Sequence, residues 1–352
     1  MVIYMLYFDY SATTPVNEAI LKEFSKYGET KYTDLLGAQE KEKLKTLLKT
    51  NMDVTYTSGS TESNNTAICG ILNKYKEKGY HIITTKLEHS SINECLSYYE
   101  KKGFIIDYVN LIDGVVDINH LKELITDKTI LVTIASVNSE TGLLQPIQKI
   151  GKVLNEKNIV FHSDMTQSIG KVNIDFSTCD MISFTSHKFF GLKGIGVLLT
   201  KKDLELTPIL YGTRTYNYAL IKSFTKALEL QFENKNQYEY VKKINTYLKE
   251  KIKNLKNENI TINSTDNCIP HILNISIKNY KPETFLHRLE MDDILISTKS
   301  ACSSTNDYSK AVYTLTNDLK RAKTSVRISL SYLTTQQDID KLISSIEVIT
   351  NE

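Results

Sequence analysis

The sequence predicts an α/β protein in which a mostly parallel sheet lies between helices, with a smaller α+β domain toward the C-terminus. Short apolar or β-branched runs alternate with helical patterns through the first two thirds of the chain, and this alternation stops in the last third. The length of 352 residues suits two domains. We expect a large domain over 15–250 and a small one formed by 1–14 with 251–352, with the boundary inside 215–255.

The expected strands of the large domain are short runs rich in apolar and β-branched residues. They are Val54–Thr57, His81–Thr84, Phe104–Val109, Ile130–Ala135, Ile159–His162, Met181–Thr185 and Gly196–Thr200. Helical periodicity is found between them, over Thr61–Lys78, Ser91–Lys101, Ile118–Ile125 and Ile147–Asn155. Strands that are joined by helices run parallel, so both faces of this sheet should be buried.

The remaining chain begins with a long helical stretch, 216–254, that is rich in Lys, Glu, Asn and Tyr. Four further strands are expected after it, with helical segments between them: Ile260–Ile262, Ile272–Ile277, Ile294–Ser297 and Val326–Leu330. This pattern indicates a small α+β domain, to which the first residues of the chain can also contribute.

Composition excludes several classes of protein. The 43 basic and 41 acidic side chains nearly cancel, so no charge excess favours nucleic acid or a membrane surface. The N-terminus lacks a signal-peptide pattern, and no apolar run reaches the roughly 18 residues that a membrane span needs. The five cysteines are scattered, which argues against a disulfide framework or a zinc site. We therefore expect a cytoplasmic protein.

Polar clusters follow four of the expected strands, where the carboxyl ends of strands form the ligand crevice of open α/β sheets. They are 58–61, Asn138, Asp164 and 186–188. In the first cluster, Ser60 and Thr61 begin a helix whose N–H groups could bind a phosphate. An ordinary helix cap by either residue is the alternative, and the segment alone leaves both open.

Asp164 and Lys188 suggest more specific chemistry. A carboxylate directly after a strand could pair with a pyridinium nitrogen, or could cap the following segment. Exposed lysines are common, but a crevice lysine that is desolvated and close to positive charge can become a Schiff-base nucleophile. The neighbouring His187 is expected to supply that charge.

Cys302 is the cysteine with the best case for chemistry. It lies in a run of small polar residues, 297–304, after an expected strand, which indicates an exposed loop. Cys69 and Cys95 fall within helical patterns and are expected to be core residues. Cys179 and Cys268 have no informative context.

Taken together, these segments resemble the NifS/IscS-like cysteine desulfurases, which are fold-type I pyridoxal phosphate (PLP) enzymes related to class V aminotransferases. The likeness runs nearly end to end. Its most specific parts are the opening motif, the His-Lys pair and the Ser-Ala-Cys loop. The matching segments are 7–15, 58–64, 87–89, 137–142, 164–167, 186–188, 300–302 and 326–329.

The resemblance implies roles for the matching residues. Lys188 would hold PLP as a Schiff base and carry protons at the substrate carbon, and His89 would stack on the ring as a further acid or base. Asp164 would pair with the ring nitrogen and Gln167 with the phenolic oxygen. The residues that would contact the phosphate are Ser60, Thr61, Thr185, His187 and, from the other subunit, Thr215.

The substrate and partners are implied in the same way. Asn138 and Arg327 would hold the carboxylate of L-cysteine, with Asn138 also near the cofactor, and a guanidinium fork suits that task. Cys302 would take the sulfur as a persulfide, release L-alanine, and pass the sulfur to an acceptor protein for iron–sulfur clusters or tRNA thiolation. The position of Thr215 implies a homodimer.

The sequence departs from the family pattern at three places. Segment 28–34 lacks the usual Asn-Pro-Ser-Ser-x-His and has Asp34 in place of the histidine, the glycine-rich loop before Thr215 is short, and the region after Cys302 is compact. A selenocysteine lyase or another class V aminotransferase-type enzyme is therefore an alternative. Cys302 argues against an aminotransferase, because transamination needs no thiol. A non-enzymatic interaction homologue is a second alternative.

Overall fold

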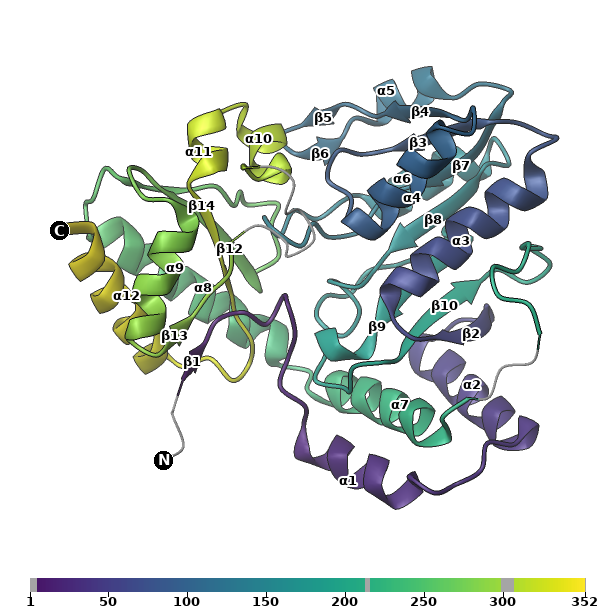
Figure 1. Ribbon diagram of the computed structural model, residues 1–352, viewed down its shortest axis with the longest axis horizontal. Coiled ribbons are helices and arrows are strands. Elements are labelled where there is room, and N and C mark those ends of the chain that lie inside the picture. The colour runs from purple at the N-terminus through teal and green to yellow at the C-terminus, as the bar shows by residue number, and fades with distance from the viewer. Residues whose placement is uncertain (1–4, 213–215, 299–306, 352) are drawn as a thin grey trace. The chain divides into compact units, whose positions relative to one another are not determined.

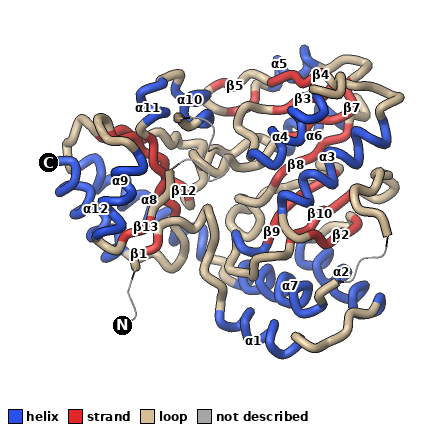
Figure 2. Tube along the Cα trace, in the orientation of Figure 1, coloured by secondary structure: helices blue, strands red, loops and turns tan. Residues whose placement is uncertain are grey.

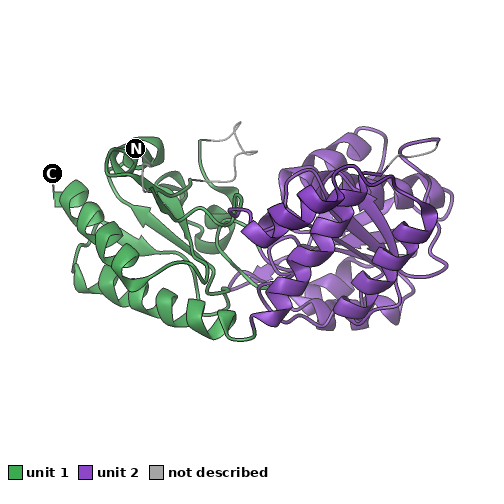
Figure 3. Ribbon diagram, turned by 90° about the horizontal axis from the view of Figure 1, so that it is seen from below, with its two compact units in different colours: residues 1–13, 138–144, 235–352 green, residues 14–137, 145–234 purple. Residues whose placement is uncertain are grey.

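The structure is a computed structural model that describes residues 5–212, 216–298 and 307–351. Its contacts divide the chain into two compact units, coloured separately in Figure 3. Unit 1 contains 1–13, 138–144 and 235–352, and unit 2 contains 14–137 and 145–234. The division thus falls at residue 235 instead of the expected 250. The physical reason is helix α8 (Gln237–Asn254), whose buried Val241 and Leu248 belong to the core of unit 1.

Unit 2 is built on a seven-stranded sheet in the order β2-β10-β9-β8-β7-β3-β4. The strands are β2 (Asp53–Thr57), β3 (His81–Thr84), β4 (Ile105–Tyr108), β7 (Thr129–Thr133), β8 (Val160–Asp164), β9 (Met181–Thr185) and β10 (Gly196–Thr200). The pairs from β9 through β4 are parallel, which confirms the predicted α/β fold. β10 alone is antiparallel to its neighbours, because the short segment between β9 and β10 holds no crossover helix.

Helices cover both faces of this sheet (Figures 1 and 2). One face packs against α3 (Ser60–Tyr75) and α4 (Ser90–Glu100). The other face packs against α1 (Glu18–Tyr27), α2 (Asp34–Leu48), α5 (Ile118–Leu124), α6 (Ile147–Asn155) and α7 (Tyr218–Glu233). Ile82 belongs to the first core and the adjacent Ile83 to the second, as the alternation of side chains along a strand requires.

Unit 1 contains a three-stranded antiparallel sheet of β11 (Ile260–Ile262), β12 (Ile272–Ile277) and β14 (Ser325–Ser329). Near the start of the chain, β1 (Leu6–Tyr7) pairs in parallel with β13 (Ile294–Leu295). The helices of this unit are α8, α9 (Pro282–Met291), α10 (Lys310–Thr316), α11 (Leu319–Lys323) and α12 (Gln336–Asn351). The predicted small α+β domain and the contribution of the first residues to it are thus present.

Two shorter features complete the description. β5 (Leu111–Ile112) and β6 (Val115–Val116) form a small hairpin in unit 2. The expected single helical stretch over 216–254 is wrong, because it is divided into α7 and α8. Asn234 leaves helical geometry at the end of α7, and Asn236 occupies the N-cap position of α8 without a side-chain capping hydrogen bond; asparagine is often found at helix ends and turns.

No helix in the described ranges combines the length and the apolar character that crossing a bilayer demands.

His162 is a fully buried titratable residue of β8 in the sheet of unit 2. Its Nδ1 lies 2.8 Å from Thr133 Oγ1 and its Nε2 lies 2.9 Å from Ser183 Oγ. Burial lowers the pKa of His162 to about 4, against a smaller opposing effect of the Asp164 charge. The folded protein therefore holds this imidazole neutral at neutral pH.

We expect His162 to make the protein less stable in acid. The unfolded chain binds a proton on this histidine near pH 6.5, whereas the folded chain does so only at about pH 4. The free energy of unfolding should therefore fall as the pH drops through this window, by at most about 1.4 kcal/mol per pH unit. Urea unfolding of His162→Gln should give a shallower pH slope than wild type. His287→Gln, which removes an exposed imidazole, is the control, and equal slopes for wild type and His162→Gln would contradict the account.

Candidate active site

The carboxyl end of β8 places Asp164 in a buried polar cluster of unit 2. Its Oδ2 accepts a hydrogen bond from Asn64 Nδ2 (2.8 Å) and its Oδ1 accepts one from Thr166 N (2.9 Å). Asn64 Nδ2 also donates to Ser91 Oγ (2.9 Å), which lies 2.9 Å from His89 Nδ1. Hydrogen bonds therefore connect Asp164 with His89 through Asn64 and Ser91.

This series of hydrogen bonds determines the chemistry that is open to Asp164 and His89, the residues at its two ends. The carboxylate of Asp164 is only 7% exposed, and a donor at each oxygen is what a buried charge requires. His89 is the N-cap of α4, and its Nδ1 accepts from Ser91 N (3.2 Å). A neutral His89 therefore carries its proton on Nε2. Asp164 thus offers a negative charge, and His89 offers an N–H donor.

Glu88 connects the segment before His89 to the end of β7. Both of its carboxyl oxygens lie within hydrogen-bonding distance of Ala135 N (3.1 and 2.9 Å), and Thr85 Oγ1 donates to Oε1 (2.7 Å). Burial raises the pKa of Glu88 to about 8, and the Asp164 charge acts in the same direction. Glu88 is thus mainly protonated at neutral pH, which limits the negative charge around Asp164.

The N-terminus of α3 lies beside the end of β9. Its N-cap is Gly59, which has no side chain to bond the first turn, so the alternative of a helix cap by Ser60 or Thr61 does not hold. A Cβ on Gly59 would lie 4.0 Å from Thr185 Oγ1. A Cβ on Gly196 would come within 2.7 Å of the Gly59 backbone, so glycine allows this close approach. The first N–H groups of a helix have no acceptor within it and suit an anion.

Lys188 lies in the 3-10 turn η1 (Ser186–Lys188) directly after β9. Thr14, from the end of the opening motif, holds this segment. Its Oγ1 lies 3.0 Å from the carbonyl oxygen of His187, and Phe190 N donates to the same hydroxyl at 2.6 Å. Thr14 N also donates to the His187 carbonyl at 2.9 Å. Within unit 2, Thr14 thus fixes the backbone of the segment that contains Lys188.

Positive charge surrounds His187. Burial, followed by the charges of Lys188, Lys193 and Lys171, lowers the pKa of His187 to about 3. The expectation that His187 supplies positive charge to Lys188 is therefore wrong, because its ring is neutral at neutral pH. The nearby positive charge comes from Lys171 and Lys193, and a cluster of this kind favours a phosphate dianion.

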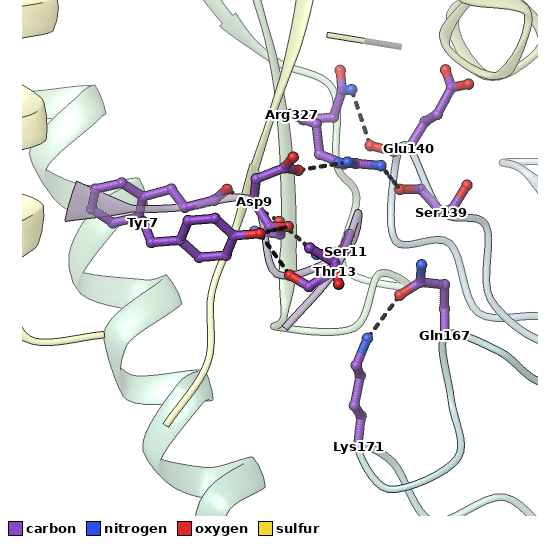
Figure 4. Close-up of polar contacts among 12 residues, drawn as sticks. Tyr7, Asp9, Ser11, Thr13, Ser139, Glu140, Gln167, Lys171 and Arg327 are labelled. Atoms are coloured by element: carbon purple, nitrogen blue, oxygen red, sulfur yellow. Dashed lines mark hydrogen bonds and ion pairs between the residues drawn. The ribbon is translucent and has the colours of Figure 1, made fainter. Parts of the chain in front are cut away.

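Two predicted cofactor ligands already have partners within the protein. Lys171 Nζ donates to Gln167 Oε1 at 2.8 Å, as Figure 4 shows, and this contact orients the amide. Thr185 Oγ1 donates its single proton to the carbonyl of Ile195 at 2.8 Å, so in this rotamer it can only accept from a ligand. The roles of Gln167 and Thr185 toward a cofactor stay predictions.

The donor set of unit 2 fits PLP. A pyridinium nitrogen needs a carboxylate, which Asp164 offers, and an aldehyde needs a primary amine, which Lys188 offers. A phosphate dianion needs N–H donors and positive charge, which α3 and the lysines around His187 offer. Each chemical group of the cofactor therefore has a matching group in this unit.

A second group of predicted residues lies in unit 1. Arg327 on β14 donates through Nη2 to Asp9 Oδ1 (2.7 Å) and through Nη1 to the carbonyl of Ser139 (2.9 Å), as Figure 4 shows. Its side chain is 3% exposed, and its Nε is buried without a hydrogen-bond partner among the described residues. With five N–H donors, this guanidinium retains donors that a carboxylate ligand could use.

Asn138 forms the turn that precedes the Ser139 carbonyl. Its Oδ1 accepts from Glu140 N (3.0 Å), Thr141 N (2.8 Å) and Thr141 Oγ1 (2.9 Å). The amide oxygen therefore stabilises the turn, and a ligand would have to meet the amide NH2 group. Within unit 1, the structure thus brings Arg327 and the Asn138 turn together through Ser139.

Two predicted site residues lie outside the described part of the chain, and three residues that were not predicted lie beside the predicted ones. Cys302 and Thr215 lie outside the described residues, so their roles stay predictions. No site role was predicted for Asn64, Ser91 or Glu88. A signal existed for Asn64, because it follows Ser60 by four residues and so lies on the same helical face.

Comparisons with known proteins agree with this fold. The family model "Aminotransferase class-V" matches residues 6–342. The chain is 34% identical to "Cysteine desulfurase IscS" of Buchnera aphidicola subsp. Baizongia pistaciae (strain Bp), over 98% of this chain and 93% of that protein.

Two solved structures are also similar to this chain. One is a NifS-like protein with a TM-score of 0.91 and 27% identity, covering 99% of both chains. Another, described as SspA in complex with cysteine, has a TM-score of 0.80 and 28% identity, covering 94% of this chain and 99% of that one.

The fold and the site therefore define an enzyme of the class V aminotransferase type. More narrowly, the chain belongs to the NifS/IscS-like cysteine desulfurases of the class V aminotransferase family. The predicted family, the predicted fold-type I architecture and the expectation of an enzyme are confirmed. The alternative of a non-enzymatic homologue loses its support.

Asn64→Ala tests the contacts of Asp164. The substitution removes one donor from the buried Asp164 carboxylate and one from Ser91, which should lower the free energy of unfolding of the PLP-free protein by about 2 kcal/mol. Asn65→Ala is the matched control, since its amide donates to the carbonyls of Thr61 and Ser91 and not to the Asp164 carboxylate. We expect less than about 1 kcal/mol for the control by urea unfolding. Equal losses for both variants would contradict a special role for Asn64.

Proposed function

We propose that this chain is a PLP-dependent cysteine desulfurase that acts on L-cysteine. The hydrogen-bond chain from Asp164 through Asn64 and Ser91 to His89 is the observation that carries the proposal. It combines a negative charge for a pyridinium nitrogen with an imidazole N–H donor in one unit that also contains Lys188. The relatives named cysteine desulfurase support the reaction, and the solved relative in complex with cysteine supports the substrate.

When bound, PLP supplies an electron sink for negative charge at the substrate carbon. In the proposal Asp164 keeps the ring nitrogen protonated, while Gln167 bonds the phenolic oxygen. Lys188 would hold the cofactor covalently and would move protons at the substrate carbon. The N-terminus of α3 would hold the phosphate together with side chains of both subunits, namely Ser60, Thr61, Thr185, His187 and the partner's Thr215.

Arg327 and Asn138 bind the substrate carboxylate in this proposal. The buried Nε of Arg327 supports the assignment, because a bound carboxylate would supply the acceptor that this N–H group lacks among the described residues. Asp9 already bonds Nη2, so it holds the guanidinium plane in place. A planar, oriented fork favours a carboxylate over other groups of the substrate.

The sulfur is removed by the thiolate of Cys302 in this proposal. It attacks the sulfur of L-cysteine, forming an S–S bond while the C–S bond breaks. The electron pair stays with the substrate carbon, which takes a proton through Lys188 and leaves as L-alanine. Cys302 then carries the persulfide. A free cysteine has a pKa near 8.5, so the thiol must lose its proton locally to a neighbouring base.

The persulfide sulfur is passed to an acceptor protein that serves iron–sulfur cluster assembly or tRNA thiolation. We further propose that the enzyme is a cytoplasmic homodimer, since the family resemblance gives Thr215 a role at the phosphate of the other subunit. Selenocysteine is the alternative substrate. Parallel assays with L-cysteine and L-selenocysteine that measure alanine release distinguish the two, and a preference for selenocysteine would change the assignment.

Lys188→Ala tests the covalent link to the cofactor. Because an alanine side chain cannot form a Schiff base, the variant should lose both the visible absorbance of the linked cofactor and any linkage that borohydride can reduce. Lys193→Ala is the matched control, since it removes a nearby positive charge but no proposed linkage. A reducible linkage that persists in Lys188→Ala would show that another lysine holds PLP.

Cys302→Ser separates sulfur transfer from cofactor binding. Serine has nearly the same shape, so the variant should bind PLP and L-cysteine, but its hydroxyl cannot form a persulfide. Mass spectrometry after treatment with L-cysteine should find added sulfur on Cys302 of wild type and none on the variant. Cys268→Ser is a control that should keep the persulfide. Undiminished alanine release by Cys302→Ser, or a persulfide on another cysteine, would overturn the role of Cys302.

A further inference from the structure

Two cysteines face each other between α3 and α4, in the core of unit 2. Cys69 Sγ on α3 lies 3.5 Å from Cys95 Sγ on α4. A disulfide requires about 2.05 Å between the sulfur atoms, so they need to approach by only about 1.5 Å. The pair therefore has the proximity that disulfide formation requires.

The packing of the two helices keeps the thiols together. Ile68 and Leu72 of α3 and Ile92 and Leu96 of α4 belong to one apolar cluster, so the helices are held at a fixed separation. The two thiols differ in access: Cys69 is partly exposed, whereas Cys95 is 7% exposed. A reagent in solution should therefore meet Cys69 first.

Their surroundings also make the two thiols chemically unequal. The hydrogen bond with Cys95 lowers the pKa of the Cys69 thiol against the opposing effect of burial, and Tyr99 and the charge of Lys102 act in the same direction as Cys95. The pKa of Cys95 is raised by its contact with Cys69 and by burial. A thiol that ionises easily beside one that stays protonated is the arrangement of an attacking and a resolving cysteine.

We propose that Cys69 and Cys95 form a reversible dithiol–disulfide site that reacts with low-molecular-weight disulfides. The Cys69 thiolate attacks one sulfur of the small disulfide and releases one thiolate, which takes up a proton. Cys95 then loses its proton and attacks Cys69 Sγ, which releases the second small thiol. The two cysteines are oxidised by two electrons, and the small disulfide is reduced to two thiols.

This site is separate from the sulfur transfer proposed for Cys302, and its place in the fold gives it a structural consequence. α3 supplies Asn64 and α4 supplies Ser91 to the hydrogen-bond chain at Asp164. A Cys69–Cys95 bond would connect these two helices covalently. The remaining described cysteines lie in other settings: Cys179 is 5% exposed, and Cys268 Sγ lies 3.8 Å from Thr265 Oγ1.

The test is peptide mapping of the full-length protein after incubation with glutathione disulfide. Free thiols are alkylated, the protein is digested, and peptides are measured by mass spectrometry with and without dithiothreitol. We expect a linked peptide pair that contains Cys69 and Cys95, which dithiothreitol separates. Cys179→Ser, at a buried cysteine of the same unit, is the control and should leave this pair unchanged.

Two variants distinguish a resolving partner from a chance neighbour. Cys95→Ser should trap glutathione on Cys69, with an occupancy at least about tenfold higher than in wild type, because no second thiol displaces it. Cys69→Ser should leave Cys95 unmodified. Circular dichroism identifies any variant that fails to fold. In that case the peptide map of the wild-type protein alone tests whether Cys69 and Cys95 form a disulfide. Stable glutathione on wild-type Cys69, no reaction at Cys69, or linkage to a different cysteine would overturn the proposal.

Discussion

The buried charge of Asp164 is the constraint on which the site of unit 2 depends. A carboxylate that is almost removed from water must be hydrogen bonded, and its donors come from a helix and from the turn after β8. Asn64 can reach it only because α3 crosses the sheet with its N-terminus beside β9. The same amide contacts Ser91, so the position of His89 also follows from this requirement. Protonated Glu88 completes the arrangement, because a second ionised carboxylate there would oppose the first.

Positive charge complements this negative group within the same unit. Lys171, Lys188 and Lys193 surround the neutral ring of His187, and Thr14 holds the segment on which His187 and Lys188 lie. A ligand with a protonated ring nitrogen and a phosphate dianion matches both charges. Unit 1 contributes a different chemistry, because Arg327 is held by Asp9 and Ser139 and its buried Nε–H group has no acceptor among the residues that the structure describes. In the proposed function, residues of unit 2 would bind the cofactor and residues of unit 1 would bind the substrate carboxylate.

Most of the fold could be predicted because the apolar runs and the helical periods are local signals, and Met181–Thr185, Gly196–Thr200 and Ile272–Ile277 have the predicted bounds. The direction of β10 and the break at Asn234 were missed, since they depend on a short connection and on helix ends.

Sequence motifs indicated that Asp164 and Lys188 are site residues, whereas the place of Asn64 beside Asp164 became visible only in contacts between distant segments. The prediction that His187 carries a positive charge was wrong, because the residues next to it in sequence do not reveal that its ring is buried. Helical patterns predicted that Cys69 and Cys95 are core residues, which holds for Cys95 but not for the partly exposed Cys69, and the patterns did not show that the two sulfur atoms meet.

The central claim is that Asp164 keeps the ring nitrogen of PLP protonated. NMR of the protein loaded with PLP that carries ¹⁵N in the ring measures this directly, because pyridinium and pyridine nitrogens have distinct chemical shifts. The account predicts a pyridinium signal in the wild-type protein at neutral pH and a pyridine signal in Asp164→Asn, which should retain PLP but lose turnover. A pyridine signal in wild type, or a pyridinium signal and near wild-type turnover in Asp164→Asn, would contradict it.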